Sequence, residues 1–273
     1  MQLKIHQMSK KKIVCSLIIS TYNWPEALRL VLKSLNNQSI FPDEAIIADD
    51  GSGISTKNLV EEEKTKFSFP IKHIWHKDNG FRKAEILNKA IAKSIGNYII
   101  QVDGDCIMHN RFIENHLSFS GKNTYLYGSR VNIQKNHLDL LFYKEQVHFS
   151  FFSKGIKKRG RTLYILILAN LIKAKNSFSH KFRGCNTSFY KKDFIAVNGY
   201  NEDFKGWGRE DSELAFRFHN FGLLSKRLKF QGIVYHIFHN EKSKNNLEKN
   251  NNIELETIEN KRVWTENGIN KYL

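Results

Sequence analysis

The sequence predicts an α/β fold with a mostly parallel central sheet. In the first half of the chain, short β-branched runs alternate with stretches whose apolar residues recur at helical spacing. The chain has 273 residues, 41% of them hydrophobic, which is enough to bury a sizeable core. Strands that alternate with helices are joined by right-handed crossovers and therefore lie parallel. Ligands of such sheets bind beyond the carboxyl ends of the strands.

The elements of the first half follow in order along the chain. The predicted strands are residues 13–20, 45–49, 71–76 and 98–102. The first helix begins behind Pro25, a residue tolerated in a first turn, and a polar helical stretch is predicted at 55–66. A third helix follows from the spacing of Leu87, Ala90 and Ile91. Three of these strands end in polar turns, so one edge of the sheet carries polar groups.

The second half is less regular. Residues 137–182 are rich in aromatic and basic residues without clean periodicity, and Lys157-Lys158-Arg159-Gly160-Arg161 precedes the apolar run 163–172. This pairing suits either a membrane surface or anionic acceptor, or a solvated basic loop before an ordinary core helix. From residue 184 onward the pattern again predicts regular elements: a strand at 185–190, a glycine-rich loop at 198–208, a helix at about 209–221 and a strand near 233–238. An Asn- and Lys-rich stretch, 243–252, precedes a predicted terminal helix.

The composition limits the classes of partner that the protein could bind. Lys and Arg number 43 against 27 Asp and Glu, a net charge of +16, which indicates nucleic acid, a phosphorylated substrate or a lipid surface. The three cysteines are interpreted as buried small hydrophobes in a reducing compartment. The apolar run 13–19 lacks a cleavage pattern and predicts a buried strand rather than a signal peptide, and 163–172 is about half a bilayer span. We expect a cytoplasmic protein, with peripheral contact at the inner face of an anionic membrane as an addition.

Acidic residues follow the fourth predicted strand. Asp103-Gly104-Asp105 presents two carboxylates at a strand end, with Gly104 between them to let a ligand approach the backbone. Carboxylate oxygens suit Mg²⁺ or Mn²⁺, which commonly bridge to diphosphate oxygens. Alone, the triplet could equally be a turn capped by two aspartates. Its context is the Ser20-Thr21-Tyr22-Asn23 and Asp49-Asp50-Gly51-Ser52 stretches, which end two further strands.

With these motifs, the chain resembles the family 2 glycosyltransferases, which are inverting enzymes with the GT-A (Rossmann-like) nucleotide-sugar-binding fold. The resemblance covers about residues 13–239. The Gly206-Trp207-Gly208-Arg209-Glu210-Asp211 loop is similar to that of the β-1,4-galactosyltransferases and of bacterial chondroitin and polysaccharide synthases. The implied division is 1–135 for nucleotide-sugar binding, 136–183 for a variable basic and aromatic insertion, 184–240 for acceptor binding and catalysis, and 241–273 for the tail.

The resemblance also implies roles in donor binding. Residues around the nucleotide sugar are, in this view, Ser20 and Tyr22 at the base, Asp50 at uracil, Arg82 at the diphosphate, and Asp103 with Gly104 near the ribose and metal. Asp105 is implied as the metal-binding carboxylate and His239 as its histidine ligand, with His236 in reserve. Imidazole with carboxylate favours Mn²⁺ over Mg²⁺, although Mg²⁺ is an alternative.

The Glu210-Asp211 pair can be argued from spacing as well. If a helix begins near Arg209, Asp211 lies on the same face as Leu214 and Phe218, one turn ahead of them. A carboxylate in a first turn is stabilised in its charged form, which suits a general base, although simple charge compensation has the same pattern. Asp211 is therefore the predicted base and Glu210 the next candidate. Glu213 and Arg217 can pair on another face.

The predicted function is metal-dependent inverting transfer of a hexose or N-acetylhexosamine from a UDP-sugar to a glycan or lipid-linked acceptor in bacterial surface polysaccharide synthesis. Trp207 and Gly208 would contact the acceptor side, with Trp207 as a flat wall for a sugar ring. A nucleotidyltransferase is the first alternative, but the glycine-rich phosphate loop typical of those enzymes is missing after the first strand. A nucleic-acid-binding protein is the second, and the acidic strand ends argue against it. No nucleic acid partner is expected.

Overall fold

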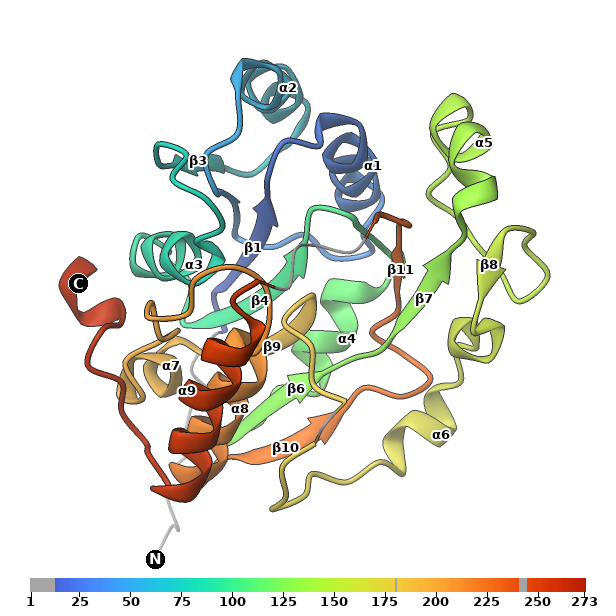
Figure 1. Ribbon diagram of the computed structural model, residues 1–273. Helices are drawn as coiled ribbons and strands as arrows, with labels where there is room; N and C mark the ends of the chain where they lie inside the picture. The colour runs from blue at the N-terminus through green and yellow to red at the C-terminus, as the bar shows by residue number, and fades with distance from the viewer. Residues whose placement is uncertain (1–12, 180, 241–244) are drawn as a thin grey trace, which may run out of the picture.

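The computed structural model describes residues 13–179, 181–240 and 245–273, and it confirms the predicted α/β class (Figure 1). A seven-stranded sheet has the order β10-β6-β9-β4-β1-β2-β3. Within it, β4-β1-β2-β3 and β6-β10 pair in parallel, and β9 runs antiparallel to β4 and β6. The central sheet is therefore mostly parallel, with β9 joining its two parallel groups. The basic residues 10–12 and positions 243–244 of the Asn- and Lys-rich stretch lie outside the described residues.

The strands agree closely with the sequence pattern, because β1, β2 and β4 are short buried runs. Their bounds are β1 (Cys15–Thr21), β2 (Glu44–Asp49), β3 (Ile71–Trp75), β4 (Tyr98–Asp103), β5 (Cys106–Met108), β6 (Thr124–Tyr127), β7 (Arg130–Ile133), β8 (Ile156–Lys157), β9 (Asn186–Tyr190), β10 (Leu224–Arg227) and β11 (Val234–His236). All seven residues of β1 are buried, as the interpretation of residues 13–20 as a core strand requires.

Helices cover both faces of this sheet. The α-helices are α1 (Pro25–Asn36), α2 (Ile54–Glu63), α3 (Lys83–Ala92), α4 (Phe112–Ser118), α5 (Leu138–Tyr143), α6 (Leu166–Asn170), α7 (Lys191–Ala196), α8 (Glu210–Asn220) and α9 (Leu247–Glu259), and the 3-10 helices are η1 (Lys64–Lys66), η2 (Lys135–His137), η3 (Arg159–Thr162) and η4 (Ile269–Tyr272). Alternate residues of a strand face opposite sides of a sheet. Ile18 accordingly packs with α3, α7 and α8, whereas Leu17 and Ile19 pack with α1, α2 and α4.

A second, four-stranded sheet, β5-β11-β7-β8, lies beside the first. Its apolar residues pack against α5 and against Ala27 and Leu30 of α1, forming a third core cluster. In this sheet β11 pairs with β5, which directly follows Asp103-Gly104-Asp105. The pairing brings the histidines at the end of β11 back to the carboxyl end of β4. All three cysteines are buried free thiols, as predicted.

Two expectations about helices are wrong. The apolar run 163–172 is not a core helix: α6 has five residues, of which only Ala169 is buried, and Ile167 is 79% exposed. The last α-helix starts earlier than expected, at Leu247 inside the Asn- and Lys-rich stretch, because the buried Asn250 bonds to the carbonyls of Lys205 and Gly208. Among the described residues, no helix is long and apolar enough to cross a bilayer.

Candidate active site

The strand ends that carry the polar motifs are level with one another. The register sets Ser20 beside Asp103 and Thr21 beside Asp49. The Ser20 hydroxyl donates to Oδ1 of Asp103 at 2.7 Å, and the Gly104 amide donates to the Ser20 carbonyl at 2.7 Å. A Cβ at Gly104 would lie 2.9 Å from that carbonyl oxygen, so only glycine allows this close approach of β4 to β1. The sheet thus fixes the acidic turn rigidly.

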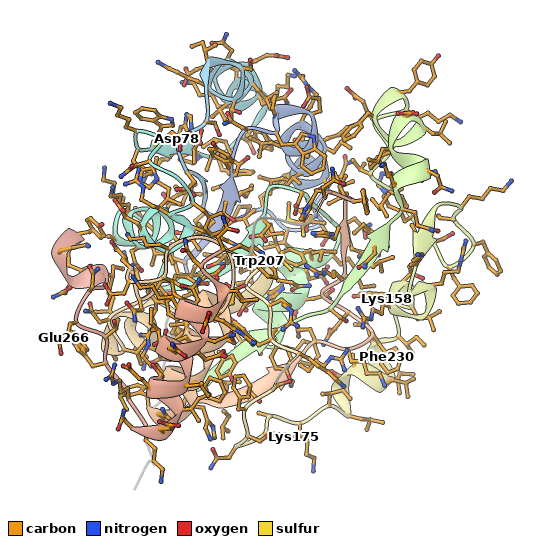
Figure 2. All side chains as sticks on the ribbon, in the orientation of Figure 1. Asp78, Lys158, Lys175, Trp207, Phe230 and Glu266 are labelled. Atoms are coloured by element: carbon orange, nitrogen blue, oxygen red, sulfur yellow. The ribbon has the colours of Figure 1, made fainter. Side chains whose placement is uncertain are left out.

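A pocket of about 770 Å³ opens at this edge. Of the predicted site residues, all but Arg82 and His236 are among the described residues that line it. Its walls come from the β1, β2 and β4 ends, from the Gly206–Asp211 loop, from α8 and from α9. Trp207, which is labelled near the centre of Figure 2, is part of that loop and is partly exposed. The sequence therefore identified residues that are far apart in the chain and share one cavity.

Lys83 is the pocket residue that sequence reasoning missed. Its ammonium lies 2.8 Å from Oδ1 of Asp103. Burial alone would lower the pKa of Lys83, but Asp103, Asp211 and Glu210 together raise it well above its usual value. Burial would likewise raise the pKa of Asp103, but Lys83 and the Ser20 hydroxyl hold it below its usual range. One ammonium therefore balances three carboxylates at the centre of the pocket.

The predicted base and its neighbour begin α8. Oδ2 of Asp211 accepts a hydrogen bond from the Gly184 amide at 2.9 Å, whereas Oδ1 is buried with no hydrogen-bond partner among the described residues. Burial and the adjacent Asp211 raise the pKa of Glu210 to about 7, and Lys83 opposes that rise. Oε2 of Glu210 likewise has no partner among the described residues. Two carboxylate oxygens are thus left with acceptor capacity that a ligand hydroxyl could satisfy.

Asp50 lines the pocket, and each of its two carboxylate oxygens already has a hydrogen-bond partner. Nε2 of His76 lies 2.7 Å from Oδ1, and the Arg82 amide donates to Oδ2 at 2.8 Å. Each carboxylate oxygen can accept a second hydrogen bond, so this pairing orients Asp50 without saturating it. The Arg82 guanidinium bonds to Glu85 and to the Lys77 carbonyl, and Arg82 is not among the pocket-lining residues described. The Tyr22 hydroxyl donates to Asp78 at 2.9 Å.

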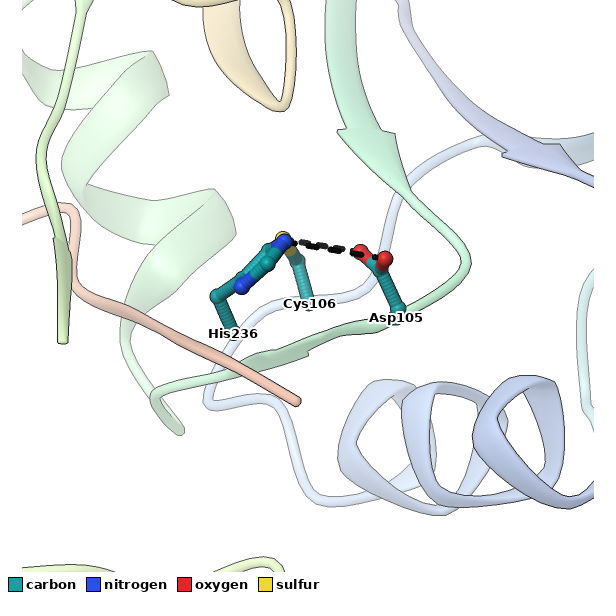
Figure 3. Close-up of side chains that lie close together, drawn as sticks. All are labelled: Asp105, Cys106 and His236. Atoms are coloured by element: carbon teal, nitrogen blue, oxygen red, sulfur yellow. Dashed lines mark hydrogen bonds and ion pairs between the residues drawn. The ribbon is translucent and has the colours of Figure 1, made fainter. Parts of the chain in front are cut away.

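Asp105 faces both predicted histidines. Its Oδ2 lies 3.6 Å from Nε2 of His236 (Figure 3). The same oxygen lies 3.5 Å from Nε2 of His239. Two ligands of one ion, each roughly 2.0–2.2 Å from it, can be no more than roughly 4 Å apart, so both spacings fit a shared ion. Nδ1 of His239 lies 2.7 Å from the Asn240 carbonyl, which only accepts, so the neutral ring has its free lone pair on Nε2.

His239 is the better placed of the two histidines, because it lines the pocket. His236 instead belongs to a compact group with Asp105 and the Cys106 thiol, whose ligand atoms lie within 4.8 Å of one another. Burial lowers the pKa of His236, although Asp105 opposes that shift, and this favours the neutral ring, which is the form that coordinates a metal. The donor set of carboxylate and imidazole fits Mn²⁺. The neighbouring thiol of Cys106, which belongs to β5, is a softer ligand.

The comparisons with known proteins agree with this geometry. The model of "Glycosyl transferase family 2" matches residues 16–178, which is more than half of the chain. The chain belongs to glycosyl transferase family 2. A second model, the "N-terminal domain of galactosyltransferase", matches residues 169–240, the part that holds the Gly206–Asp211 loop and His239. Together the two matches include every described pocket-lining residue except Leu247, Glu254 and Ile258 of α9.

Relatives of this family 2 glycosyltransferase include polysaccharide synthases. It is 25% identical over 237 residues to a chondroitin synthase of Escherichia coli and 26% identical over 239 residues to a hyaluronan synthase of Pasteurella multocida. Both alignments cover 81% of this chain, but only 34% and 24% of the respective relatives. The chain therefore spans about a third or less of the length of these relatives.

Solved structures share its GT-A fold. Residues 1–349 of TarS of S. aureus in complex with UDP superpose with a TM-score of 0.58 at 17% identity, covering 88% of this chain and 64% of that TarS fragment. The mannosyltransferase PcManGT of Pyrobaculum calidifontis, in complex with GDP-Man and Mn²⁺, gives a TM-score of 0.58 at 14% identity, covering 83% of this chain and 57% of PcManGT.

In this family 2 glycosyltransferase, α9 holds the loop that precedes Glu210 and Asp211. The Asn250 amide donates to the carbonyls of Lys205 and Gly208, and Leu247 packs against Gly208. Gly206, Gly208 and Arg209 all have positive φ, and Arg209 is held in this conformation by Asn251 and Glu254. Nothing in the local sequence indicates these contacts, because they join residues 39 to 45 positions apart.

Proposed function

We propose that this protein transfers a hexose or N-acetylhexosamine from a UDP-sugar to a hydroxyl of a glycan or lipid-linked acceptor, with inversion and with a divalent metal ion. The proposal rests on one observation: a single pocket is lined by two acidic groups that come from different elements. Asp103 and Asp105 lie at the β4 end with His239 nearby, whereas Glu210 and Asp211 enter from α8. Inverting transfer needs this separation, because one group must serve the diphosphate and another the attacking hydroxyl.

The donor side supports a nucleotide diphosphate sugar. Ser20, Tyr22 and Asp50 line the pocket around the β1 and β2 ends, where ligands of parallel sheets bind. Asp50 is oriented by His76 and the Arg82 amide and is our candidate for accepting the uracil N–H. Relatives with the same fold have been solved with UDP, with UDP-GlcNAc and with GDP-Man. Lys83, already inside the pocket, is placed to exchange part of its pairing with Asp103 for a phosphate oxygen.

Asp105 and His239 would hold the metal ion, with His236 behind them. When bound, the ion supplies positive charge beside the diphosphate leaving group. Mn²⁺ is the preferred ion because of the imidazole donor, and PcManGT was solved with Mn²⁺. The chain itself contributes the orientation: the Asn240 carbonyl fixes the tautomer of His239, and the Cys106 thiol lies 3.4 Å from Oδ1 of Asp105.

The chemical step is a single displacement. The acceptor oxygen forms a bond to the anomeric carbon from the face opposite the diphosphate, the bond from that carbon to the phosphate oxygen breaks, and the hydroxyl proton passes to Asp211. The electron pair leaves with UDP. No covalent enzyme intermediate forms, so the free thiols need no nucleophilic role. Trp207 offers its ring as a flat wall for the acceptor sugar.

A panel of nucleotide sugars tests the proposal. With Mn²⁺ and a glycan acceptor mixture present, we expect UDP release from one or two UDP-sugars and none from GDP-sugars or after chelation. UDP should also raise the melting temperature more than CDP does, because Asp50 can accept a further hydrogen bond from the uracil N–H, whereas N3 of cytosine has no proton to donate. Release from a GDP- or CDP-sugar in preference to every UDP-sugar, or full activity in excess chelator, would contradict it.

A further inference from the structure

One side of the molecule exposes apolar side chains that a globular surface normally covers. We call this surface the lateral flank; it is formed by residues 143–175, which contain β8, η3 and α6 (Figure 1). Phe152 is 87% exposed, Ile167 79% and Leu171 69%. Tyr143, Phe151, Leu163, Leu166 and Leu168 are exposed as well. Single exposed hydrophobics are ordinary, but this concentration within one short segment marks an interaction surface.

The lateral flank is also strongly basic. Within the flank, residues 146–175 contain seven Lys and Arg and no Asp or Glu, and its one acidic residue, Glu145, pairs with Lys33. Five of these cations are exposed lysines: Lys154, Lys157, Lys158, Lys173 and Lys175. Lys158 is labelled on this side of the molecule in Figure 2. The apolar side chains are therefore interspersed with positive charge that no acidic residue of this stretch neutralises.

Hydrogen bonds to the rest of the molecule hold the flank in place. The Arg159 guanidinium donates to the Phe151 carbonyl at 2.8 Å, which fixes the turn carrying Phe152. The backbone of Ile165 bonds to Phe230 just before α6, and that of Lys175 pairs with Ser225 five residues after it, so the segment that contains α6 is tied to the rest of the molecule on both sides. These contacts leave Ile167 and Leu171 outside while Ala169 is buried. The exposed face is a fixed platform.

We propose that the lateral flank binds the surface of an anionic lipid bilayer. Lysines attract acidic headgroups, and Phe152, Ile167 and Leu171 enter the interface between headgroups and acyl chains. A nucleic acid would match the charge but would leave the aliphatic side chains of Ile167 and Leu171 in water, so the combination favours lipid. The proposal goes beyond the proposed function and does not depend on it.

The flank continues directly into the pocket. The Arg161 guanidinium donates to the Arg130 carbonyl at 2.8 Å, and Arg130 lines the pocket. Phe178 and Phe182, which follow the flank in the chain, line it as well. A bilayer bound at the flank would therefore lie beside the acceptor side of the pocket, within reach of an acceptor that is anchored in lipid.

Vesicle cosedimentation tests the proposal with the intact chain. The charge variant is Lys154→Gln/Lys157→Gln/Lys158→Gln, which spares Arg159 and Arg161 because they bond to backbone carbonyls. The apolar variant is Phe152→Ser/Ile167→Ser. The matched controls change exposed groups of the same kind elsewhere: Lys57→Gln/Lys93→Gln/Lys249→Gln and Ile54→Ser/Leu273→Ser. The vesicles are phosphatidylcholine alone or with phosphatidylglycerol, at low and at high salt.

We expect the unaltered protein to bind the phosphatidylglycerol vesicles and to be partly released by salt. The charge variant should bind roughly 100-fold more weakly at low salt, because each cation near an anionic surface contributes a factor of about five. The apolar variant should lose at least roughly tenfold at either salt concentration. Both controls should bind as the unaltered protein does. Equal binding by all five proteins, or no binding by any, would overturn the proposal.

Two further measurements distinguish a loss of membrane binding from misfolding and from dissociation of a dimer. UDP affinity should be the same in all five proteins, so its loss would indicate misfolding, and failure of vesicle binding with intact UDP affinity contradicts the membrane proposal alone. Light scattering without lipid should give one particle mass throughout. If the apolar variant instead dissociates a dimer and leaves vesicle binding unchanged, the flank is an interface between two copies and the proposal is wrong.

Discussion

The Gly184 amide donates to Oδ2 of Asp211 at 2.9 Å, and the two residues are so close that a Cβ on Gly184 would lie 2.0 Å from Oδ1. Gly184 immediately precedes the Cys185 that lines the pocket, whereas Asp211 is in the first turn of α8. The contact therefore sets the position of the predicted base from outside its own helix. Only glycine at position 184 leaves the carboxylate where it is.

This contact predicts that Gly184→Ala displaces Asp211. A displacement of about 1 Å can cost roughly 100-fold in rate, so the transfer rate should fall by about that factor while UDP affinity stays constant. Gly160→Ala is the matched control, since a Cβ there meets no atom within 4 Å. Steady-state kinetics and UDP calorimetry on both variants provide the measurement. An unchanged rate in Gly184→Ala would show that this contact does not position the base.

The two histidines should differ in their effect on metal affinity. His239→Ala removes a ligand whose Nε2 faces both Asp105 and the pocket, so Mn²⁺ affinity in the presence of UDP should fall by two orders of magnitude or more. Mn²⁺ affinity should fall less in His236→Ala, because His236 is not among the described residues that line the pocket. Titration of Mn²⁺ followed by electron paramagnetic resonance measures both. The reverse order would make His236 the ligand.

Glu210 should make the metal-free protein less stable as pH rises. Its folded-state pKa of about 7, raised by burial and by Asp211, is above the roughly 4.3 expected in the unfolded chain, so the folded state binds the proton more tightly. The stability contributed by that proton is complete below about pH 4 and is lost as pH rises to about 7.

Urea denaturation at several pH values in chelator checks this expectation. The free energy of unfolding should fall between pH 5 and pH 7 by at most about 1.4 kcal/mol per pH unit more than in Glu210→Gln. The Gln variant keeps the shape of the side chain and removes its titration. Parallel curves for the two proteins would mean that Glu210 is already ionised at pH 5.

A buried ion pair within α8 stabilises the fold. Nε of Arg217 lies 2.7 Å from Oε1 of Glu213, and the two side chains are 0% and 1% exposed. Arg217→Met would leave a buried carboxylate without its cation and should cost about 3–5 kcal/mol of unfolding free energy. Arg262→Met, which breaks the exposed pair with Glu256, should cost about 1 kcal/mol or less. Urea denaturation compares them, and similar losses would contradict the assigned importance of the buried pair.

Much of the fold and the strand-end part of the site could be predicted because they depend on local pattern. Parallel strands are short apolar runs, and Asp103-Gly104-Asp105 follows one directly, so its placement comes from counting along the chain. The Glu213 and Arg217 pair was also predicted from its spacing of four, although nothing in that spacing indicates that α9 buries it.

The parts that could not be predicted depend on contacts between distant segments. Lys83 is an ordinary lysine at the start of α3 until β4 brings Asp103 to it, and Gly184 acquires its role only through α8. Likewise, the Leu163 to Ile172 run has the composition of a core helix. Its exposure follows from the backbone bonds at Ile165 and Lys175, which no local pattern reveals.

The most direct test of the account is the transfer rate of Asp211→Asn, measured together with its UDP affinity and melting temperature. The substitution keeps the shape of the side chain but cannot accept the hydroxyl proton, so turnover should fall by roughly 10²–10⁴-fold with UDP affinity unchanged. A near-normal rate with a lowered melting temperature would contradict the account, since Asp211 would then be only a helix-start charge, and Glu210 would become the candidate base.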